Sequence, residues 1–235
     1  MRHIADYHKG HCIAIPARLE SSRLKHKLLI ELDGVPVIKR CYDNVKKCGL
    51  KTFVLTDSQQ IADIIGKDAY IVDGDFRNGT ERIAAAEHMG MFDNYTDVIN
   101  VQGDQPFVDP NWITTTINLL KTSQITHLYT TLKDEDKTDP SVVKLIRSGD
   151  NLLWMTRNAT YGERGVFVYG YSRFFLQMHR SLEVPEEEIQ ENVEQLRWLK
   201  AGVKVRVDWV NVPDNFVDIN TQKDVDKWRI DNDAR

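Results

Sequence analysis

Apolar and polar positions follow a regular order through the first half of the chain. Four short runs are apolar and rich in β-branched side chains, as is typical of buried strands: residues 12–16, 51–56, 69–72 and 97–102. Three segments between them have the pattern of helices: residues 36–48, 58–66 and 81–90. Thr80 is a candidate cap for the last of these. Strands that alternate with helices predict an α/β fold, with a mostly parallel, twisted sheet covered by helices on both faces.

The pattern of the second half is less regular. Strands are predicted at residues 126–132, 165–172 and 203–212, and a β-hairpin at 142–157 around the turn Ser148-Gly149-Asp150. Residues 221–230 predict a last helix. Residues 186–202 predict one amphipathic helix whose core-facing side chains are Ile189, Val193, Leu196 and Leu199.

No internal repeat or low-complexity linker divides the chain, so we expect one domain over residues 1–235. Residues 1–11 are polar and are predicted to be a flexible extension. Residues 135–185 interrupt the alternation of strands and helices. We expect them to form a smaller, β-containing excursion that carries substrate specificity or subunit contacts.

Composition narrows the class of protein. The chain has 235 residues, 41% of them hydrophobic, which is enough for a full core. A net charge of −4 argues against nucleic-acid binding. No apolar run approaches the roughly 20 residues of a membrane helix, and no signal-peptide core is present, so membrane insertion is not expected. Three cysteines without metal-binding spacing favour a reducing cytoplasm.

A cluster of cations follows the first predicted strand. Arg18, Arg23, Lys25, His26 and Lys27 stand within eleven residues that hold a single acid. Ligands of parallel sheets bind beyond the carboxyl ends of the strands. Arginine forks and lysine charges at that edge are suited to a polyphosphate, although a solvated charged loop would have the same composition. The segment has neither the P-loop spacing nor the dinucleotide-binding glycines.

Two aspartates stand at the ends of predicted elements and are candidates for the same ligand-binding edge. Asp104 follows Gly103 at the end of the predicted strand 97–102, and Asp218 precedes the predicted last helix. Either one alone could simply begin a turn or cap a helix. Two carboxylates beside a cationic phosphate site are typical of Mg²⁺ bound together with substrate phosphates. Nucleotidyl transfer requires little more from a protein than alignment and neutralisation of charge.

Six blocks in this order resemble the 3-deoxy-manno-octulosonate (Kdo) cytidylyltransferases: IPARLESSRLKHKLL, RNGTERIAAA, INVQGDQPFVDP, VYGYS, ENVEQLRWLKAG and VDINTQKDV. The resemblance runs from about residue 12 to residue 229. It implies a nucleotide-diphospho-sugar transferase-like, Rossmann-type fold. It also implies attack of the anomeric hydroxyl of a 3-deoxy keto-sugar acid, Kdo or a close analogue, on the α-phosphate of CTP, with release of pyrophosphate. Mg²⁺ would be the cofactor of a cytoplasmic homodimer that serves lipopolysaccharide biosynthesis.

The resemblance also implies roles for individual residues. The triphosphate would be bound by Arg18, Arg23 and Lys27, and the rest of the nucleotide by Asn78, Gly79, Arg82 and Gln102. Mg²⁺ would be held by Asp104 and Asp218, which with Arg18 and Lys27 form the predicted catalytic set. The sugar acid would be contacted by Tyr169, Glu194 and Gln195. On helix geometry alone, Glu194 follows the core-facing Val193 and would face water.

Four departures from the family pattern bear on these roles. Lys25 and His26 replace the proline and glycine of the loop, and Gln105 replaces an acid beside the expected metal. Gly165 stands in place of a histidine, and the stretch before Val166 is shorter than in the family. Histidine rarely takes the backbone angles that glycine tolerates, so a changed loop turn is an open possibility. The changes near Gly165 lie on the side of the sugar.

Two alternatives stand beside this hypothesis. One is a nucleotidyltransferase of the same architecture that uses a sialic- or pseudaminic-type acid, a sugar phosphate or a pterin cofactor. The loop lacks the glycine-rich LAGGxSxRMG pattern of the sugar-phosphate and pterin enzymes, which disfavours those substrates. The other is a non-catalytic nucleotide-binding relative. Retention of both Asp104 and Asp218 argues against it.

Overall fold

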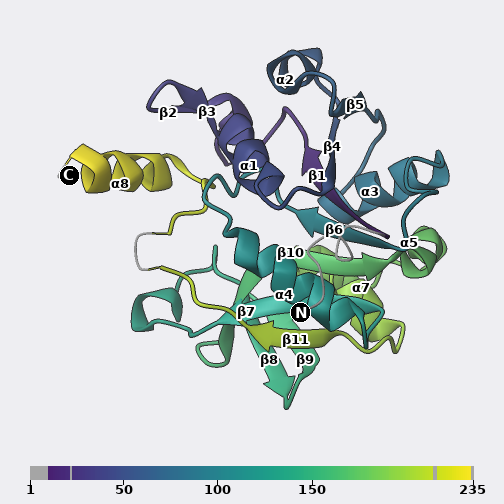
Figure 1. Cartoon of the computed structure of the whole chain (residues 1–235). Helices are drawn as coiled ribbons and strands as arrows, with labels where there is room; N and C mark the ends of the chain where they lie inside the picture. The colour runs from purple at the N-terminus through teal and green to yellow at the C-terminus, as the bar shows by residue number, and fades with distance from the viewer. Residues whose placement is uncertain (1–9, 22, 214–215, 234–235) are drawn as a thin grey trace, which may run out of the picture.

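The computed structural model describes residues 10–21, 23–213 and 216–233. Within these residues one nine-stranded sheet has the order β5-β4-β1-β6-β10-β7-β11-β9-β8 (Figure 1). Its strands are β1 (His11–Ala17), β4 (Lys51–Thr56), β5 (Ala69–Ile71), β6 (Asp97–Val101), β7 (Ile125–Thr130), β8 (Lys144–Ser148), β9 (Asn151–Thr156), β10 (Glu163–Ser172) and β11 (Arg206–Trp209). A separate hairpin joins β2 (Glu31–Leu32) to β3 (Val35–Pro36).

The helices are α1 (Val37–Lys46), α2 (Gln59–Ile65), α3 (Gly79–His88), α4 (Pro110–Leu120), α5 (Arg173–His179), α6 (Glu186–Glu191), α7 (Leu196–Lys200) and α8 (Gln222–Asp233). Short 3-10 turns occur at η2 (Lys27–Leu29) and η3 (Asp134–Asp136). Among the described residues, no helix combines the length and the apolar character that crossing a membrane would require.

The first half of the chain builds the parallel part of the sheet, as the sequence predicts. Strands β5, β4, β1 and β6 are parallel neighbours, and Ile13 of β1 pairs with Thr52 on one side and Ile99 on the other. Alternate residues of β1 enter different core clusters: Ile13 and Ile15 pack with α1 and α4, whereas Cys12 and Ala14 pack with α3 and α5. Because side chains alternate along a strand, helices cover both faces.

The second half makes the sheet mixed. Strand β10 is antiparallel to both β6 and β7, and β11 is parallel to β7. The predicted hairpin is confirmed as β8 and β9, with Gly149 at a positive φ of 56° in its turn. The predicted strand 203–212 is confirmed only as Arg206–Trp209, because its parallel partner β7 ends at Thr130.

The predicted single helix over residues 186–202 is wrong. Asn192 takes the left-handed conformation (φ 50°, ψ 52°), which ends α6, and α7 begins only at Leu196. Val193 and Leu196 are buried as expected, but Ile189 is 64% exposed. A left-handed residue turns the chain out of the right-handed helix, so residues on its two sides no longer share one face.

Two other local predictions differ from the structure. The cap of α3 is Asn78, whose side chain accepts the backbone N–H of Glu81 at 2.9 Å; Thr80 lies inside the first turn. Helices α4 and α5 were not predicted, although Asp109 caps α4 and Pro110 opens it in the expected way.

The predictions for the two ends of the chain concern an N-terminal extension and a C-terminal helix. Most of the predicted extension, residues 1–9, lies outside the described residues. The prediction is wrong for His11, which begins β1 and lies 3.1 Å from the carboxylate of Asp97. The predicted last helix is confirmed as α8, which stands at the side of the molecule in Figure 1. Its Trp228 is buried and stacks on Phe107.

Candidate active site

One cavity of about 420 Å³ lies beyond the carboxyl ends of β1 and β6. Its first wall consists of the lining residues within 16–28, 76–82, 102–104 and 218–220. Its second wall consists of those within 141, 157, 167–169 and 188–195. All of the predicted site residues line this cavity: Arg18, Arg23, Lys27, Asn78, Gly79, Arg82, Gln102, Asp104, Tyr169, Glu194, Gln195 and Asp218. The structure therefore brings together residues that are up to 200 positions apart, between Arg18 and Asp218.

The basic loop is fastened to the first wall through three of its residues. Lys27 donates to the carboxylate of Asp104 and, at 3.2 Å, to the side-chain oxygen of Asn220. Arg23 donates to the same oxygen of Asn220 at 3.0 Å. The backbone N–H of Leu19 donates to Asp57 at 2.9 Å. These contacts hold the cation of Lys27 at the carboxylate of Asp104 and the cation of Arg23 at Asn220, two positions after Asp218.

His26 takes the turn that a glycine would favour. Its backbone lies in the left-handed region (φ 50°, ψ 35°) and leads into η2, which begins at Lys27. A non-glycine residue pays a steric cost there. The ring of His26 lies 3.3 Å from Glu20, and Lys27 is placed in the cavity wall. Histidine in this position therefore does not prevent a left-handed turn.

Asp104 and Asp218 are held side by side by the backbone. The N–H of Ile219 donates to the carbonyl oxygen of Asp104 at 3.1 Å. One carboxylate oxygen of Asp218 lies 3.6 Å from Arg164, and the other is buried without a hydrogen-bond partner among the described residues. Burial raises the pKa of Asp218 to about 7; the charge of Arg164 opposes this shift and that of Asp104 adds to it.

These two carboxylates fit a hard divalent cation. An unpaired buried carboxylate oxygen beside a second carboxylate is a set of ligands that Mg²⁺ accepts. No group of three or more His, Cys, Asp or Glu side chains that could hold a metal occurs in the described part of the chain. A cation at this place would thus share its ligands between Asp104, Asp218 and the substrate.

The first turn of α3 packs tightly against the end of β1. A Cβ atom on Gly79 would lie 2.7 Å from Pro16 and 3.2 Å from the amide nitrogen of Gln102, so only glycine fits without movement. The guanidinium of Arg82 donates to Asp57 at 2.8 Å and to the carbonyl oxygen of Val72 at 2.7 Å. Arg82 lines the cavity with these donors already occupied by protein acceptors.

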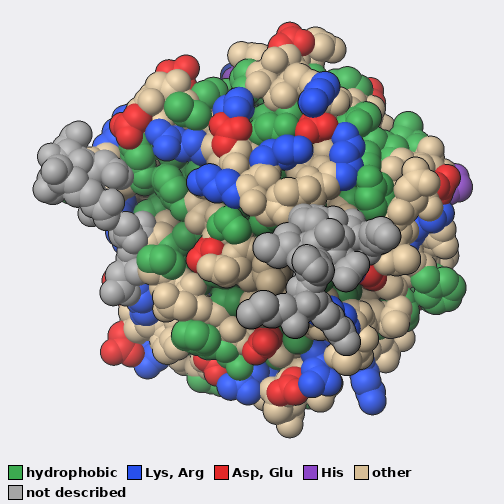
Figure 2. Space-filling view, viewed as in Figure 1, with side chains coloured by type: hydrophobic (Ala, Val, Ile, Leu, Met, Phe, Trp, Pro, Cys, Tyr) green, Lys and Arg blue, Asp and Glu red, His purple; other side chains and the backbone are tan. Residues whose placement is uncertain are grey.

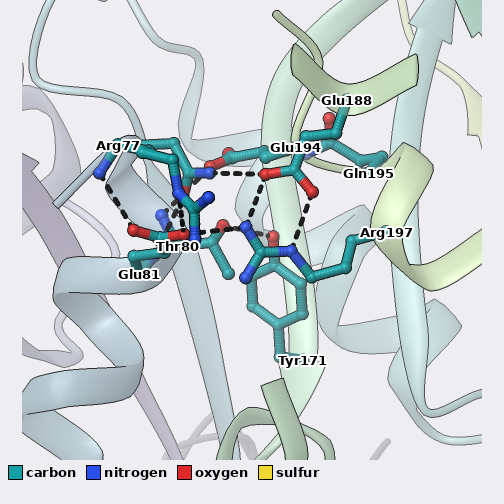
Figure 3. A network of polar contacts seen from close by, with 9 residues as sticks. Arg77, Thr80, Glu81, Tyr171, Glu188, Glu194, Gln195 and Arg197 are labelled. Atoms are coloured by element: carbon teal, nitrogen blue, oxygen red, sulfur yellow. Dashed lines mark hydrogen bonds and ion pairs between the residues drawn. The ribbon is translucent and has the colours of Figure 1, made fainter. Parts of the chain in front are cut away.

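The predicted sugar-side residues lie in the second wall. Tyr169 and Gln195 are buried, and Glu194 is partly buried. One oxygen of Glu194 accepts the backbone N–H of Thr80 at 3.1 Å (Figure 3). Burial raises the pKa of Glu194 to about 7. Glu194 faces the cavity because the chain breaks at Asn192, so the water-facing position expected from a continuous helix is wrong.

Sequence reasoning missed Arg157, which projects from the end of β9 into the second wall. Its guanidinium donates to four backbone carbonyl oxygens, those of Pro140, Ser141, Glu191 and Asn192, at 2.8 to 3.3 Å. Among the described residues no carboxylate forms a salt bridge with this cation. Burial, together with the charge of Arg23, lowers the pKa of Arg157. A cation directly after an apolar strand, as in WMTR, is the signal that could have found it.

Two departures from the family pattern have structural outcomes. Gln105 is 1% exposed and is not among the residues that line the cavity, so its side chain lies in the interior of the protein. Gly165 lines a second cavity of about 640 Å³ that shares Ser141, Phe167, Asp218 and Asn220 with the first. A Cβ atom on Gly165 would lie 3.4 Å from the buried ring of His127.

The surface gives no sign of a single-sign charged face in the view of Figure 2. There, Lys and Arg side chains are interspersed with Asp and Glu over the part of the molecule that carries α1. Lys39 and Asp43 of α1 are such a pair, at 2.5 Å. On this face no broad cationic surface of the kind that binds a long polyanion is present.

Comparison with known proteins gives concordant results. A family model described as Cytidylyltransferase matches residues 12–204. The 3-deoxy-manno-octulosonate cytidylyltransferase of Brucella anthropi is 36% identical, over 92% of this chain and 94% of its own. That of Bartonella henselae is 31% identical, over 92% of this chain and 96% of its own.

Solved structures extend the likeness to three dimensions. A CMP:2-keto-3-deoxy-manno-octonic acid synthetase complexed with CTP superposes with a TM-score of 0.83 at 27% identity, covering 96% of this chain and 99% of the other. The 4-diphosphocytidyl-2C-methyl-D-erythritol synthase of Anaerococcus prevotii has a TM-score of 0.66 at 15% identity, covering 97% and 99%. The second likeness concerns the fold alone, and both agree with the predicted α/β, Rossmann-type architecture.

Proposed function

The chain belongs to the cytidylyltransferase family, and we propose that it transfers CMP from CTP to 3-deoxy-manno-octulosonate, releasing pyrophosphate. The observation that carries this proposal is the composition of the cavity. A cationic loop and two adjacent carboxylates form one wall, and the opposite wall contains Arg157. Among the described residues, no carboxylate forms a salt bridge with Arg157. Its relatives named for this reaction match over nearly the whole chain.

The first wall would bind the nucleotide. Arg18, Arg23 and Lys27 carry the positive charge that a triphosphate requires, and all three line the cavity. Lys27 bonds to Asp104 in the structure, and phosphate oxygens would compete for its protons when CTP enters. The remaining nucleotide contacts would come from Asn78, Gly79, Arg82 and Gln102, which surround the first turn of α3.

Asp104 and Asp218 would hold Mg²⁺ together with phosphate oxygens. When bound, this cation supplies neutralisation of phosphate charge and acidifies a coordinated hydroxyl. The residues of the chain would orient the reactants: the basic loop fixes the β- and γ-phosphates, and the second wall fixes the sugar. The anomeric oxygen attacks the α-phosphorus, the bond from that phosphorus to the bridging oxygen breaks, pyrophosphate leaves with the bridging oxygen, and the hydroxyl proton passes to solvent.

The second wall suits a polyhydroxylated acid. Arg157 offers a cation that no carboxylate of the described residues neutralises in a salt bridge, which suits the carboxylate of the sugar acid. Tyr169, Glu194 and Gln195 supply donors and acceptors for its hydroxyls.

Two further parts of this proposal concern the oligomeric state and the cellular compartment. We propose a homodimer that uses residues 135–185, because Leu153, Tyr161 and Phe174 in this stretch are each more than half exposed. All three cysteines are unpaired, which favours a reducing cytoplasm as the place of action. The activated sugar would then serve as a glycosyl donor for lipopolysaccharide biosynthesis. Light scattering on the purified protein tests the dimer.

The experiment is a matrix of substrates. Kdo, its amino analogue, sialic acid and pseudaminic acid are each combined with the four nucleoside triphosphates and Mg²⁺, and pyrophosphate release is measured. We expect turnover with CTP and Kdo. Turnover with a different acid would redirect the proposal to another sugar, and binding of CTP without turnover on any acid would favour a non-catalytic relative.

A further inference from the structure

The two walls of the cavity are tied to each other by side chains at three points. All three contacts start from the N-cap or the first turn of α3 and end in the segment that runs from α6 to α7, and Figure 3 shows Thr80 and Glu81 facing Glu194 and Arg197. They are Asn78 to Glu188 at 3.1 Å, the backbone N–H of Thr80 to Glu194 at 3.1 Å, and Glu81 to Arg197 at 2.8 Å. The wall assigned to the nucleotide and the wall assigned to the sugar acid thus share one polar network.

Arg197 joins two carboxylates of this network. It is 3% exposed, and its guanidinium donates twice to Glu188, at 2.7 and 2.5 Å, as well as to Glu81. Glu81 is also bound by Arg77 at 3.0 Å. A buried, bidentate arginine–carboxylate pair fixes both distance and orientation, because the fork accepts only one plane of approach.

The segment needs such an anchor because it has little regular structure of its own. Helix α6 has six residues and α7 has five, and the left-handed Asn192 separates them. Helices of this length are not stable by themselves in water. The position of Glu194 and Gln195, which lie between the two helices, therefore depends on tertiary contacts. Arg197 lies three residues after Glu194 and two after Gln195, and it joins α7 to both α6 and α3.

We propose that Arg197 is a positioning residue that couples the two subsites, so that a nucleotide held at the first turn of α3 orders the sugar-acid wall. The identities of the two ligands rest on the proposed function. A ligand that immobilises α3 also restricts whatever is bonded to it, and the second ligand then loses less conformational freedom on binding. The coupling is reciprocal and typically changes affinity by about 5- to 150-fold.

The variant that tests this is Arg197→Gln, with Arg173→Gln as the matched control. Arg173 also bonds to a carboxylate of α3, Glu87, at 2.8 Å, but at the other end of the helix and outside the cavity. We expect Arg197→Gln to raise the KM for the sugar acid at saturating CTP by about tenfold or more, whereas the Kd of CTP in the absence of the sugar acid should change by less than about threefold. Arg173→Gln should leave both unchanged. An equal rise in the Kd of CTP alone for Arg197→Gln, or the same split for Arg173→Gln, would overturn the proposal.

A second measurement does not depend on turnover. In the wild type, CTP with Mg²⁺ should slow amide hydrogen exchange at residues 192–197, and in Arg197→Gln this protection should be lost while that of α3 persists. Absence of CTP-induced protection in the wild type would refute the coupling. If the wild type shows this protection but forms no product from Kdo, the proposed function fails and the coupling stands.

Loss of one partner leaves Glu188 buried without its cation, and the single variant can therefore unfold. The double variant Arg197→Met, Glu188→Gln removes both charges of the pair, while the side-chain amide introduced by Glu188→Gln keeps an oxygen that can accept from Asn78. It should fold and show the same rise in the KM for the sugar acid. A folded double variant with wild-type KM values for both substrates would overturn the proposal.

Discussion

The two walls of the cavity are built in different ways. In the first wall, the basic loop and Asp104 stand directly after the strands β1 and β6, and their place follows from the parallel sheet. In the second wall, Glu194 and Gln195 stand at a break between two short helices and are held by side chains. The sheet therefore places Asp104 and the start of the basic loop, whereas Glu194 and Gln195 depend on polar tethers. We expect changes in the first wall to affect chemistry and changes in the second wall to affect sugar recognition.

The largest effect should come from the carboxylates of the first wall. Asp104→Ala and Asp218→Asn should each lower kcat by about a thousandfold or more, because charge neutralisation at the reacting phosphate is lost. Circular dichroism should show both variants folded. Steady-state pyrophosphate release measures the loss. Near-normal turnover in either variant would show that this residue does not hold the metal, and would remove the proposed difference between the walls.

A smaller effect is expected at Arg157 in the second wall. Arg157→Gln should raise the KM for the sugar acid by about ten- to a hundredfold, since a charge-assisted bond to the carboxylate is lost, and leave the affinity for CTP nearly unchanged. Calorimetric titration with CTP measures the affinity for the nucleotide, and initial rates against the concentration of the sugar acid measure its KM. Arg147→Gln is the control, because Arg147 lies in the same hairpin outside the cavity. A weaker binding of CTP alone would place Arg157 with the nucleotide.

The raised pKa of Glu194 predicts a pH dependence of the free energy of unfolding, to which the raised pKa of Asp218 in the first wall adds a separate contribution. Below about pH 7 the carboxyl is protonated in the folded protein, whereas in the unfolded chain it ionises near its ordinary pKa of 4.5. The folded state then holds the proton more tightly, so the contribution of Glu194 to the free energy of unfolding falls as pH rises from about 4.5 to 7. Denaturant titrations between about pH 4.5 and 7 measure how steeply the free energy of unfolding falls with pH. In Glu194→Gln the part of this fall that comes from Glu194 should be absent. An unchanged slope would contradict the buried, protonated carboxyl.

The smallest effect is expected at two residues whose backbone is in the left-handed conformation, one beside each wall. His26→Gly should raise the free energy of unfolding by about 0.5–1 kcal/mol, because glycine takes this conformation without steric cost. Asn192→Gly should gain less, since asparagine tolerates the region better than most residues. Urea denaturation of both variants measures the difference. A loss of stability in His26→Gly would mean that the contact of His26 with Glu20 outweighs the backbone term.

The sequence identified the members of the site better than their surroundings. Every predicted site residue lines one cavity, because each belongs to a block whose order resembles a known family. The strands of the first half were predicted closely, since short apolar runs between helices leave few alternatives. Residues 186–202 were misjudged, because apolar positions with helical spacing do not reveal a left-handed residue in their midst. Arg157 was missed for a related reason: a single cation after a strand has no distinctive local pattern.

By itself, the amino-acid sequence determined the α/β class and the succession of the main strands along the chain, which follow from periodicity. Its resemblance to a known family, rather than periodicity, indicated most of the residues that line the cavity. Tertiary structure alone decided that Asp218 lies beside Asp104, that Gln105 points into the core and that Glu194 reaches the backbone of α3. Such relations join segments remote in sequence, and they are set by which buried groups find partners once the sheet and helices have packed.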